Sequence, residues 1–348
     1  MFDEQFQENG SFVTRSIANR HGIVCGYVYY QGYRAHAPGA PGRARYAQYV
    51  GPADDSALMA RVERFNAIKA ARKVRGNLVN ALAGAGLPRP PVAMGRMIEA
   101  LAKAGIFRLR AVLVGTAAYQ TFPAILGTRL NQTAAMTGDV DVAQFRSISI
   151  GVEGSSPPIL ETLRDIDPTF HAIPGLGDPA RPTAFANAAN FRLDILTAHR
   201  GGDEQMGKPM AMAALGGAAA QPLRFLDYLI REPVRSVVLY GPGVSVNVPA
   251  PARFAVHKLI VSGERPADAV GQAKSRKDLL QAGEIILALV LAGNATTLRS
   301  AFREAWERGP RWRQGLRRGA AGLDREALRA LGHASEGNID AGAGSSAQ

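Results

Sequence analysis

The sequence predicts an α+β protein: a small mixed sheet flanked by helices, preceded by an N-terminal hairpin and helix and followed by a C-terminal helical region. Two observations favour this class. Short runs rich in Val, Ile and Tyr alternate with segments that carry apolar residues at helical spacing, and the chain from Pro251 to about Leu331 shows helical spacing alone. With 348 residues, 47% of them hydrophobic, the chain can bury a sizeable core in two or so domains.

The first expected segment, 1–90, contains a β-hairpin and a basic helix. Runs rich in Tyr and Val at 26–30 and 44–50 flank a Gly/Pro-rich stretch, which is typical of a hairpin. The tyrosines could stack on bases, although packing is their more usual role. Asp55 and Ser56 lie where a helix N-cap belongs, and apolar spacing extends this helix to about residue 84, before a cluster of prolines.

The second expected segment, 91–250, holds the sheet. Its predicted elements are, in order, a helix at 92–104, a strand at 109–114, a helix at 117–126, a strand at 139–143, a helix at 157–166, a strand at 191–197, a short helix at 223–229, and a hairpin of 236–240 with 244–248. A helical region at 251–333 and a disordered Gly/Ala/Ser-rich tail at 334–348 follow.

Several classes of protein are disfavoured by composition and motifs. The longest apolar run, 285–292, is far shorter than the ~20 residues of a membrane-spanning helix, and the acidic N-terminus does not read as a secretory signal. We therefore expect a cytoplasmic protein with no membrane partner. A single cysteine and six scattered histidines argue against a disulfide or a structural zinc site, and neither a P-loop nor a G-x-S-x-G motif is present.

Three aspartates form the main functional signal. Residues i and i+2 of a strand share a face, so Asp139 and Asp141 would point the same way while Val140 packs behind them. Asp194 stands alone in an apolar strand. If the two strands are neighbours, the three carboxylates converge, and their repulsion calls for divalent cations. Two Mg²⁺ ions there would clamp the attacking and leaving oxygens of an in-line phosphoryl displacement.

A glycine turn upstream supplies the second signal. Gly115 and Thr116 follow a buried strand and open a helix, so their backbone N–H groups are suited to cradle phosphates. An Asp-x-Asp pair alone is weak, since chance also supplies Asp165 and Asp167, which we place at a helix C-terminus and loop. The pair Asp139 and Asp141 differs from this second pair in its context. It follows a strand, the Gly-Thr turn and a helix, lies on a strand itself, and precedes a third aspartate on another strand.

This order resembles the polymerase-β-type nucleotidyltransferases. The closest resemblance is to bacterial nucleotidyltransferase-like families related to abortive-infection type toxins, which carry an arginine before the acids, a later lysine and a Lys-Asp pair on a C-terminal helix. The matching residues here are Arg129, Lys258, Lys277 and Asp278, and the resemblance spans roughly residues 93–290. Thr116 replaces the usual Ser or Gly, and the gap from Thr116 to Asp139 is longer than the family norm.

The resemblance implies a small nucleotidyltransferase sheet and a Mg²⁺-dependent transfer of NMP from an NTP to an acceptor hydroxyl, with release of pyrophosphate. Asp139, Asp141 and Asp194 would be the catalytic metal ligands, with Asp194 also deprotonating or orienting the acceptor. The nucleotide would be bound by the remaining motif residues, namely Gly115, Thr116, Arg129, Lys258 and Asp278.

Charge is the sequence feature that bears on the identity of the acceptor. A net charge of +12 and two basic stretches, 61–75 and 311–318, favour an RNA end such as that of a tRNA. A protein or small-molecule acceptor is the first alternative. The second is a catalytically silent protein on the same fold that binds nucleic acid, or that partners an antitoxin or itself.

Overall fold

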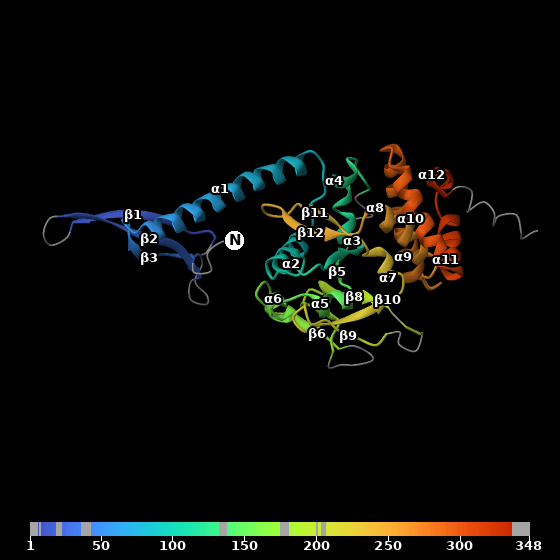
Figure 1. Cartoon of the computed structure of the whole chain (residues 1–348), viewed down its shortest axis with the longest axis horizontal. Coiled ribbons are helices and arrows are strands. Elements are labelled where there is room, and N and C mark those ends of the chain that lie inside the picture. The colour runs from blue at the N-terminus through green and yellow to red at the C-terminus, as the bar shows by residue number, and fades with distance from the viewer. Residues whose placement is uncertain are drawn as a thin grey trace, which may run out of the picture. The chain divides into compact units, whose positions relative to one another are not determined.

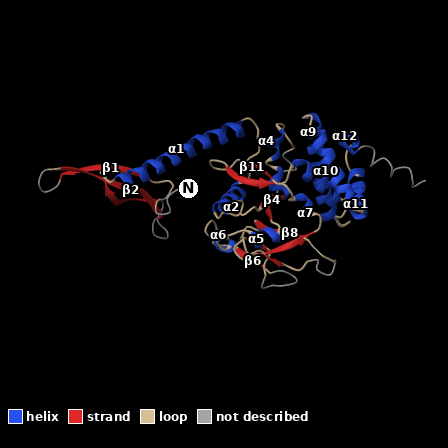
Figure 2. Cartoon of the chain, viewed as in Figure 1, coloured by secondary structure: helices blue, strands red, loops and turns tan. Residues whose placement is uncertain are grey.

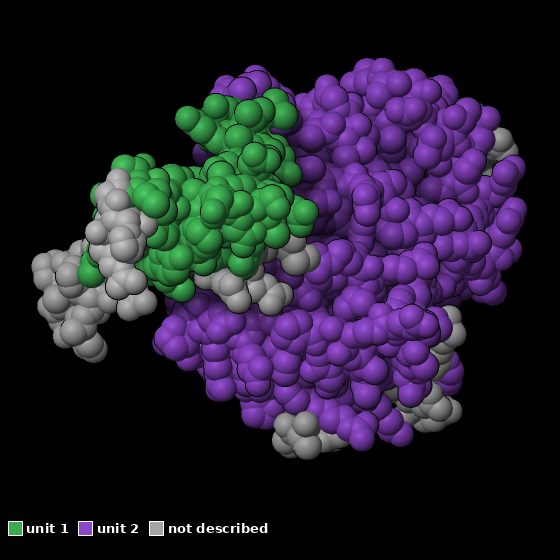
Figure 3. Space-filling view, turned by 60° about the vertical axis from the view of Figure 1, so that its left-hand side comes forward, with its two compact units in different colours: residues 1–80 green, residues 81–348 purple. Residues whose placement is uncertain are grey.

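In the computed structural model, the described residues are 6, 8–18, 23–35, 43–131, 138–174, 181–199, 201–202 and 207–335, with the backbone alone described at 34, 35, 43, 334 and 335. They form two compact units, residues 1–80 and 81–348, coloured separately in Figure 3. Helices and sheets occur together as predicted, so the α+β class is confirmed. The expected disordered tail lies outside the described residues, apart from the last two residues of the final helix.

The first unit is a three-stranded antiparallel sheet with one helix on it (Figure 1). Its strands, in spatial order, are β1 (Ser11–Ala18), β2 (Val24–Ala35) and β3 (Arg43–Pro52). Helix α1 (Ser56–Gly84) begins where predicted, because Asp55 Oδ1 accepts hydrogen bonds from the backbone N–H groups of Ala57 and Leu58. The predicted hairpin of β2 and β3 is confirmed, whereas β1 was not predicted.

The second unit is built on a seven-stranded mixed sheet. Its main path runs β4 (Val112–Val114), β5 (Asp139–Ala143), β8 (Arg192–Ala198), β10 (Ala219–Leu223) and β9 (Met210–Ala211). A short branch, β6 (His171–Ile173) and β7 (Ala184–Ala186), pairs with β8. A separate hairpin is formed by β11 (Val234–Val238) and β12 (Val244–Val248), close to the prediction.

Helices surround this sheet and make up the C-terminal region (Figure 2). They are α2 (Val92–Lys103), α3 (Gly115–Tyr119), α4 (Phe122–Leu126), α5 (Arg146–Gly151), α6 (Ile159–Arg164), α7 (Leu226–Leu229), α8 (Pro251–Ser262), α9 (Ala269–Leu291), α10 (Ala295–Glu307), α11 (Pro310–Ala321) and α12 (Arg325–Ser335). In the described part of the chain, none of the helices has the length and apolarity needed to span a bilayer.

Two predicted elements around the glycine turn differ from the observed ones in their bounds. The strand expected at 109–114 begins only at Val112, because Arg110 has a positive φ of 66° and the preceding residues form turns. The helix expected at 117–126 starts earlier, at Gly115, and is divided into α3 and α4. The short strands β9 and β10 were not predicted, since their alanine-rich sequences have low strand propensity.

Small residues hold α11 tightly against α8. A Cβ on Gly319 would lie 2.1 Å from the Leu259 carbonyl oxygen, and one on Gly315 would lie 2.9 Å from Ile260 Cγ2. Such close approach leaves α8 little freedom to shift. Helix α8 is thereby fixed between α9 and α11, with which it makes its most extensive helical contacts.

Candidate active site

The pairing of β5 with β8 brings the three predicted carboxylates together. The strands are parallel, with Asp141 directly beside Asp194. Val140, Leu193 and Ile195 are fully buried on the opposite face, as predicted. Asp139, Asp141 and Asp194 each offer an oxygen, and these oxygens all lie within 4.8 Å of one another. Among the described residues, these three aspartates are close enough together to hold a metal ion.

The electrostatics of this cluster are unfavourable without added positive charge. Burial, followed by the charges of Asp139 and Asp194, raises the pKa of Asp141 to about 7, against the opposing effects of Lys258 and Arg192. Burial also raises the pKa of Asp194, although its hydrogen bonds from Arg192 act in the other direction. At and below pH 7, a large fraction of Asp141 is therefore protonated, and a bound cation would displace that proton.

Gly115 allows the Asp141 carboxylate to occupy its position. The residue has a φ of +62°, which favours glycine, and a Cβ built on it would lie 2.2 Å from Asp141 Oδ2. Thr116 is buried in the first turn of α3, which packs against β4 and β5. The glycine turn thus contacts the acidic cluster through its backbone.

Arg192 is a site residue that the sequence did not reveal. Its Nε and Nη2 donate hydrogen bonds to Asp194 Oδ1 at 2.9 and 2.6 Å. Both residues lie on β8, two positions apart, so their side chains share one face of the strand. The ion pair orients Asp194 and offsets part of the negative charge of the cluster.

Lys258 is held beside the carboxylates by a buried ion-pair network. Its Nζ lies 2.5 Å from Asp278 Oδ1, and Arg265 binds the other oxygen of Asp278 at 2.8 and 3.0 Å. Burial would raise the pKa of Asp278, but Lys258 and Arg265 outweigh it and hold that pKa below its usual range. Asp278 therefore remains ionised and fixes Lys258, whose charge in turn lowers the pKa of Asp141.

Two further lysines, not predicted as site residues, come from α9. Lys274 acts on Asp194, since its charge favours the ionised form and lowers the pKa of that carboxyl. Burial, followed by the charge of Lys258, lowers the pKa of Lys277, while Asp139 and Asp141 are close enough to oppose that effect. Lys258 of α8 and Lys274 and Lys277 of α9 thus place positive charge beside the three aspartates, and we call these three lysines the basic wall.

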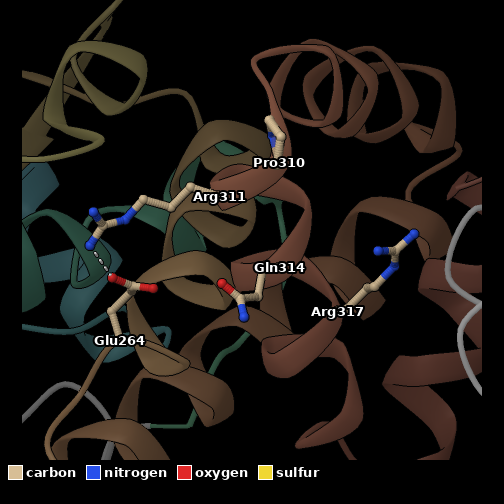
Figure 4. Close-up of a pocket in the computed structure, with 5 residues that line it drawn as sticks. All are labelled: Glu264, Pro310, Arg311, Gln314 and Arg317. Carbon is tan, nitrogen blue, oxygen red and sulfur yellow. Dashed lines mark hydrogen bonds and ion pairs between the residues drawn. The ribbon is translucent and has the colours of Figure 1, made fainter. Parts of the chain in front are cut away.

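A pocket of about 680 Å³ lies along α11, beyond the end of α8 (Figure 4). Arg311 Nη2 bonds Glu264 Oε2 at 2.7 Å, and Glu264 directly precedes the Arg265 that binds Asp278. Arg317 points away from this pair and lies over the ring of Trp306, with Cζ 4.9 Å from the ring centroid. The pocket is thus lined by two arginines, and its Glu264 lies next in the chain to Arg265 of the network around Lys258.

The other sequence candidates occupy different surroundings. Arg129 donates a hydrogen bond to the Ala85 carbonyl oxygen at 3.0 Å and lies against Gly86. Asp165 ends α6 and Asp167 accepts hydrogen bonds from Thr169 and Asn187, which confirms that this second Asp-x-Asp pair lies at a helix end and loop. On α8, the half-buried His257 precedes Lys258, and desolvation of its ring lowers its pKa to about 3, so it is neutral at physiological pH.

The donor set fits hard divalent cations. Carboxylate oxygens are the ligands that Mg²⁺, Ca²⁺ and Mn²⁺ prefer, and three of them converge here at a partly exposed position. The raised pKa of Asp141 shows that the cluster lacks compensating charge when metal-free. Asp139, Asp141 and Asp194 are therefore the residues that would hold such an ion.

Replacing Asp141 with Asn should remove a pH-dependent penalty on folding. A carboxyl whose folded pKa is raised contributes stability that is present below about pH 4 and is lost as the pH rises through about 7. In metal-free buffer the melting temperature of the wild type should fall between pH 5.5 and 8 by a few degrees more than that of Asp141→Asn. Mn²⁺ at pH 8 should raise the melting temperature of the wild type but not that of Asp141→Asn. The melting temperature of Asp165→Asn should depend on pH and on Mn²⁺ as that of the wild type does. The same pH and Mn²⁺ dependence in all three proteins would contradict the raised pKa of Asp141 and its role as a metal ligand.

A methyl group at Gly115 should disable the metal site without unfolding the chain. Gly115→Ala would push the Asp141 carboxylate aside, so the Mn²⁺-dependent rise in melting temperature should be lost. Gly127→Ala is a matched control, because Gly127 has nearly the same φ, +66°, but nothing within 4 Å of an added Cβ. It should lose about 1 kcal/mol of stability and keep the Mn²⁺ response. Equal responses from the two variants would show that contact with Asp141 is unimportant.

Comparisons with known proteins agree with this geometry. A family model described as Nucleotidyltransferase matches residues 93–307, more than half of the 348 residues. Comparisons with curated proteins and with solved structures gave no match. The matched region contains the acidic cluster on β5 and β8, the turn at Gly115, and the lysines of α8 and α9. The chain therefore belongs to a nucleotidyltransferase family.

Proposed function

We propose that this chain transfers an NMP from an NTP to an acceptor hydroxyl and releases pyrophosphate, using Mg²⁺ bound by the three aspartates. The observation that carries the proposal is the convergence of Asp139, Asp141 and Asp194 inside a matched nucleotidyltransferase region. Divalent cations bound there would neutralise phosphate charge and lower the pKa of the attacking hydroxyl.

Asp194 is suited to take the proton of the acceptor. Its pKa is raised by burial, which makes it a better base than an exposed carboxylate, and Arg192 fixes its orientation. In the proposed step the acceptor oxygen forms a bond to the α-phosphorus of the NTP, its proton passes to Asp194, and the bond from the α-phosphorus to the oxygen bridging to the β-phosphorus breaks. Pyrophosphate carries away that bonding pair.

The basic wall would bind the triphosphate. Lys258 is held in place by Asp278, so the cation is pre-positioned, which favours stabilisation of developing phosphoryl charge. Lys277 and Lys274 add positive charge beside the same carboxylates. The backbone of Gly115 and Thr116 would contact the phosphates, and Arg129 would join them only after releasing Ala85.

The acceptor we propose is an RNA end, such as that of a tRNA. The net charge of +12 attracts polyanions, and the pocket along α11 is lined by Arg311 and Arg317. The match of Arg129, Lys258, Lys277 and Asp278 to the pattern of toxin-related families supports a role among such enzymes.

Substitution of Asp139 gives the direct test of activity. Wild-type protein incubated with each α-labelled NTP, Mg²⁺ and total cellular RNA should label RNA. Asp139→Ala should reduce this label at least about 100-fold, the scale expected when a group essential for phosphoryl charge stabilisation is removed. Asp165→Ala, from the second Asp-x-Asp pair, should retain wild-type labelling.

Two outcomes would count against the proposal. Equal labelling by wild type and Asp139→Ala would remove Asp139 from the mechanism. Label that appears in protein or in small molecules, while RNA stays unlabelled, would replace the RNA acceptor.

A further inference from the structure

The sheet of the first unit has one face that α1 does not cover. On its inner face, Val28 is buried with Leu58 and Val62 of α1, and Tyr30 is buried with Phe65 of α1. Alternate residues of the same strands point the other way. This second face, the open tyrosine face, is formed by Arg15 of β1, Tyr27, Tyr29 and Tyr33 of β2, and Arg45 and Tyr49 of β3.

Tyr27, Tyr29 and Tyr49 form a cluster of rings on this face, in which Tyr27 and Tyr29 are half-buried and Tyr49 is exposed. The Tyr49 ring centroid lies 5.7 Å from that of Tyr29 and 6.0 Å from that of Tyr27, both edge to face. Tyr49 is 52% exposed and Tyr33 is 44% exposed. Edge-to-face rings do not cover one another's faces as stacked rings would, so the exposed Tyr49 ring can offer a face to a flat partner.

The charge of this face has one sign. Arg15 Cζ lies 4.9 Å from the Tyr29 ring centroid, and Arg45 hydrogen bonds to Gln31 on the same face. None of the strands β1, β2 and β3 contains an aspartate or glutamate. A partner must therefore bring flat apolar surfaces for the tyrosines together with negative charge for the arginines.

We propose that the open tyrosine face binds single-stranded RNA, with bases stacked on the tyrosine rings and phosphates paired with Arg15 and Arg45. Single strands offer both unpaired base faces and a regular row of phosphates, whereas a duplex hides its base faces. A second copy of the chain fits less well, because a two-fold contact would bring the arginines of both copies together with no acid to pair them. The choice of RNA rests on the proposed function.

Binding can be measured apart from catalysis, on the full chain without NTP or Mg²⁺. A fluorescein-labelled single-stranded RNA of about 12 nucleotides is within the range that such platforms occupy. Loss of one stacking ring in Tyr49→Ala should raise its dissociation constant at least about 5-fold, while Tyr49→Phe, which keeps the ring, should stay within about 2-fold. Unchanged circular dichroism of both variants would confirm that they are folded, as expected for a half-exposed side chain.

A second readout locates the RNA. Cys25, the single cysteine, lies on the same face of β2 as Tyr27, so bound RNA should slow its alkylation by a maleimide. Asp139→Ala should abolish NMP transfer yet bind the RNA as wild type does. If the wild type transferred no NMP to any acceptor while Tyr49→Ala still weakened RNA binding, the proposed function would be wrong and the inference about this face would stand.

Three results would overturn the inference. The first is equal RNA affinity for wild type and Tyr49→Ala, with Cys25 unprotected. The second is tighter binding of DNA of the same sequence, or of duplex RNA, than of the single-stranded RNA. The third is a dimer that Tyr49→Ala dissociates, which would assign the face to a second copy.

Discussion

The parallel pairing of β5 with β8 is the constraint on which the site depends. It sets Asp141 beside Asp194, and strand alternation adds Asp139 to the same face. Apolar residues on the opposite face, Val140, Leu193 and Ile195, are fully buried, so a slip of one residue would bury the carboxylates instead. The hydrophobic core therefore determines the register, and the register determines where the negative charge accumulates.

The surroundings of the cluster are arranged to tolerate that charge. Gly115 gives the Asp141 carboxylate room, Arg192 binds Asp194, and Lys258 is held nearby by the buried Asp278. These contacts do not fully offset the negative charge of the three carboxylates, because burial and repulsion still raise the pKa of Asp141 to about 7. A structure that keeps uncompensated carboxylates together stores unfavourable energy that cation binding can release, which is typical of functional sites.

Sequence alone predicted the α+β class, the strands that carry the aspartates and the face on which they lie, because strand alternation is a local property. Lys258 and Asp278 were identified only through the resemblance to a known family. Arg192 was missed, since its pairing with Asp194 cannot be distinguished by sequence from ordinary solvation. Lys277 was named only as part of the Lys-Asp pair of that family and was given no site role, and Lys274 was missed, because their position beside the acids depends on how α8 and α9 pack. Local patterns predict faces, whereas tertiary packing decides which faces meet.

The central claim is that Asp139, Asp141 and Asp194 together hold divalent cations for nucleotidyl transfer. Anomalous diffraction from crystals grown with Mn²⁺ and a non-hydrolysable NTP analogue would test it most directly, since Mn²⁺ accepts the same oxygen ligands as Mg²⁺. The account predicts manganese peaks at coordination distance from the carboxylates of all three aspartates, with the triphosphate between them and Lys258. Nucleotide bound elsewhere, or manganese absent from these carboxylates, would contradict it.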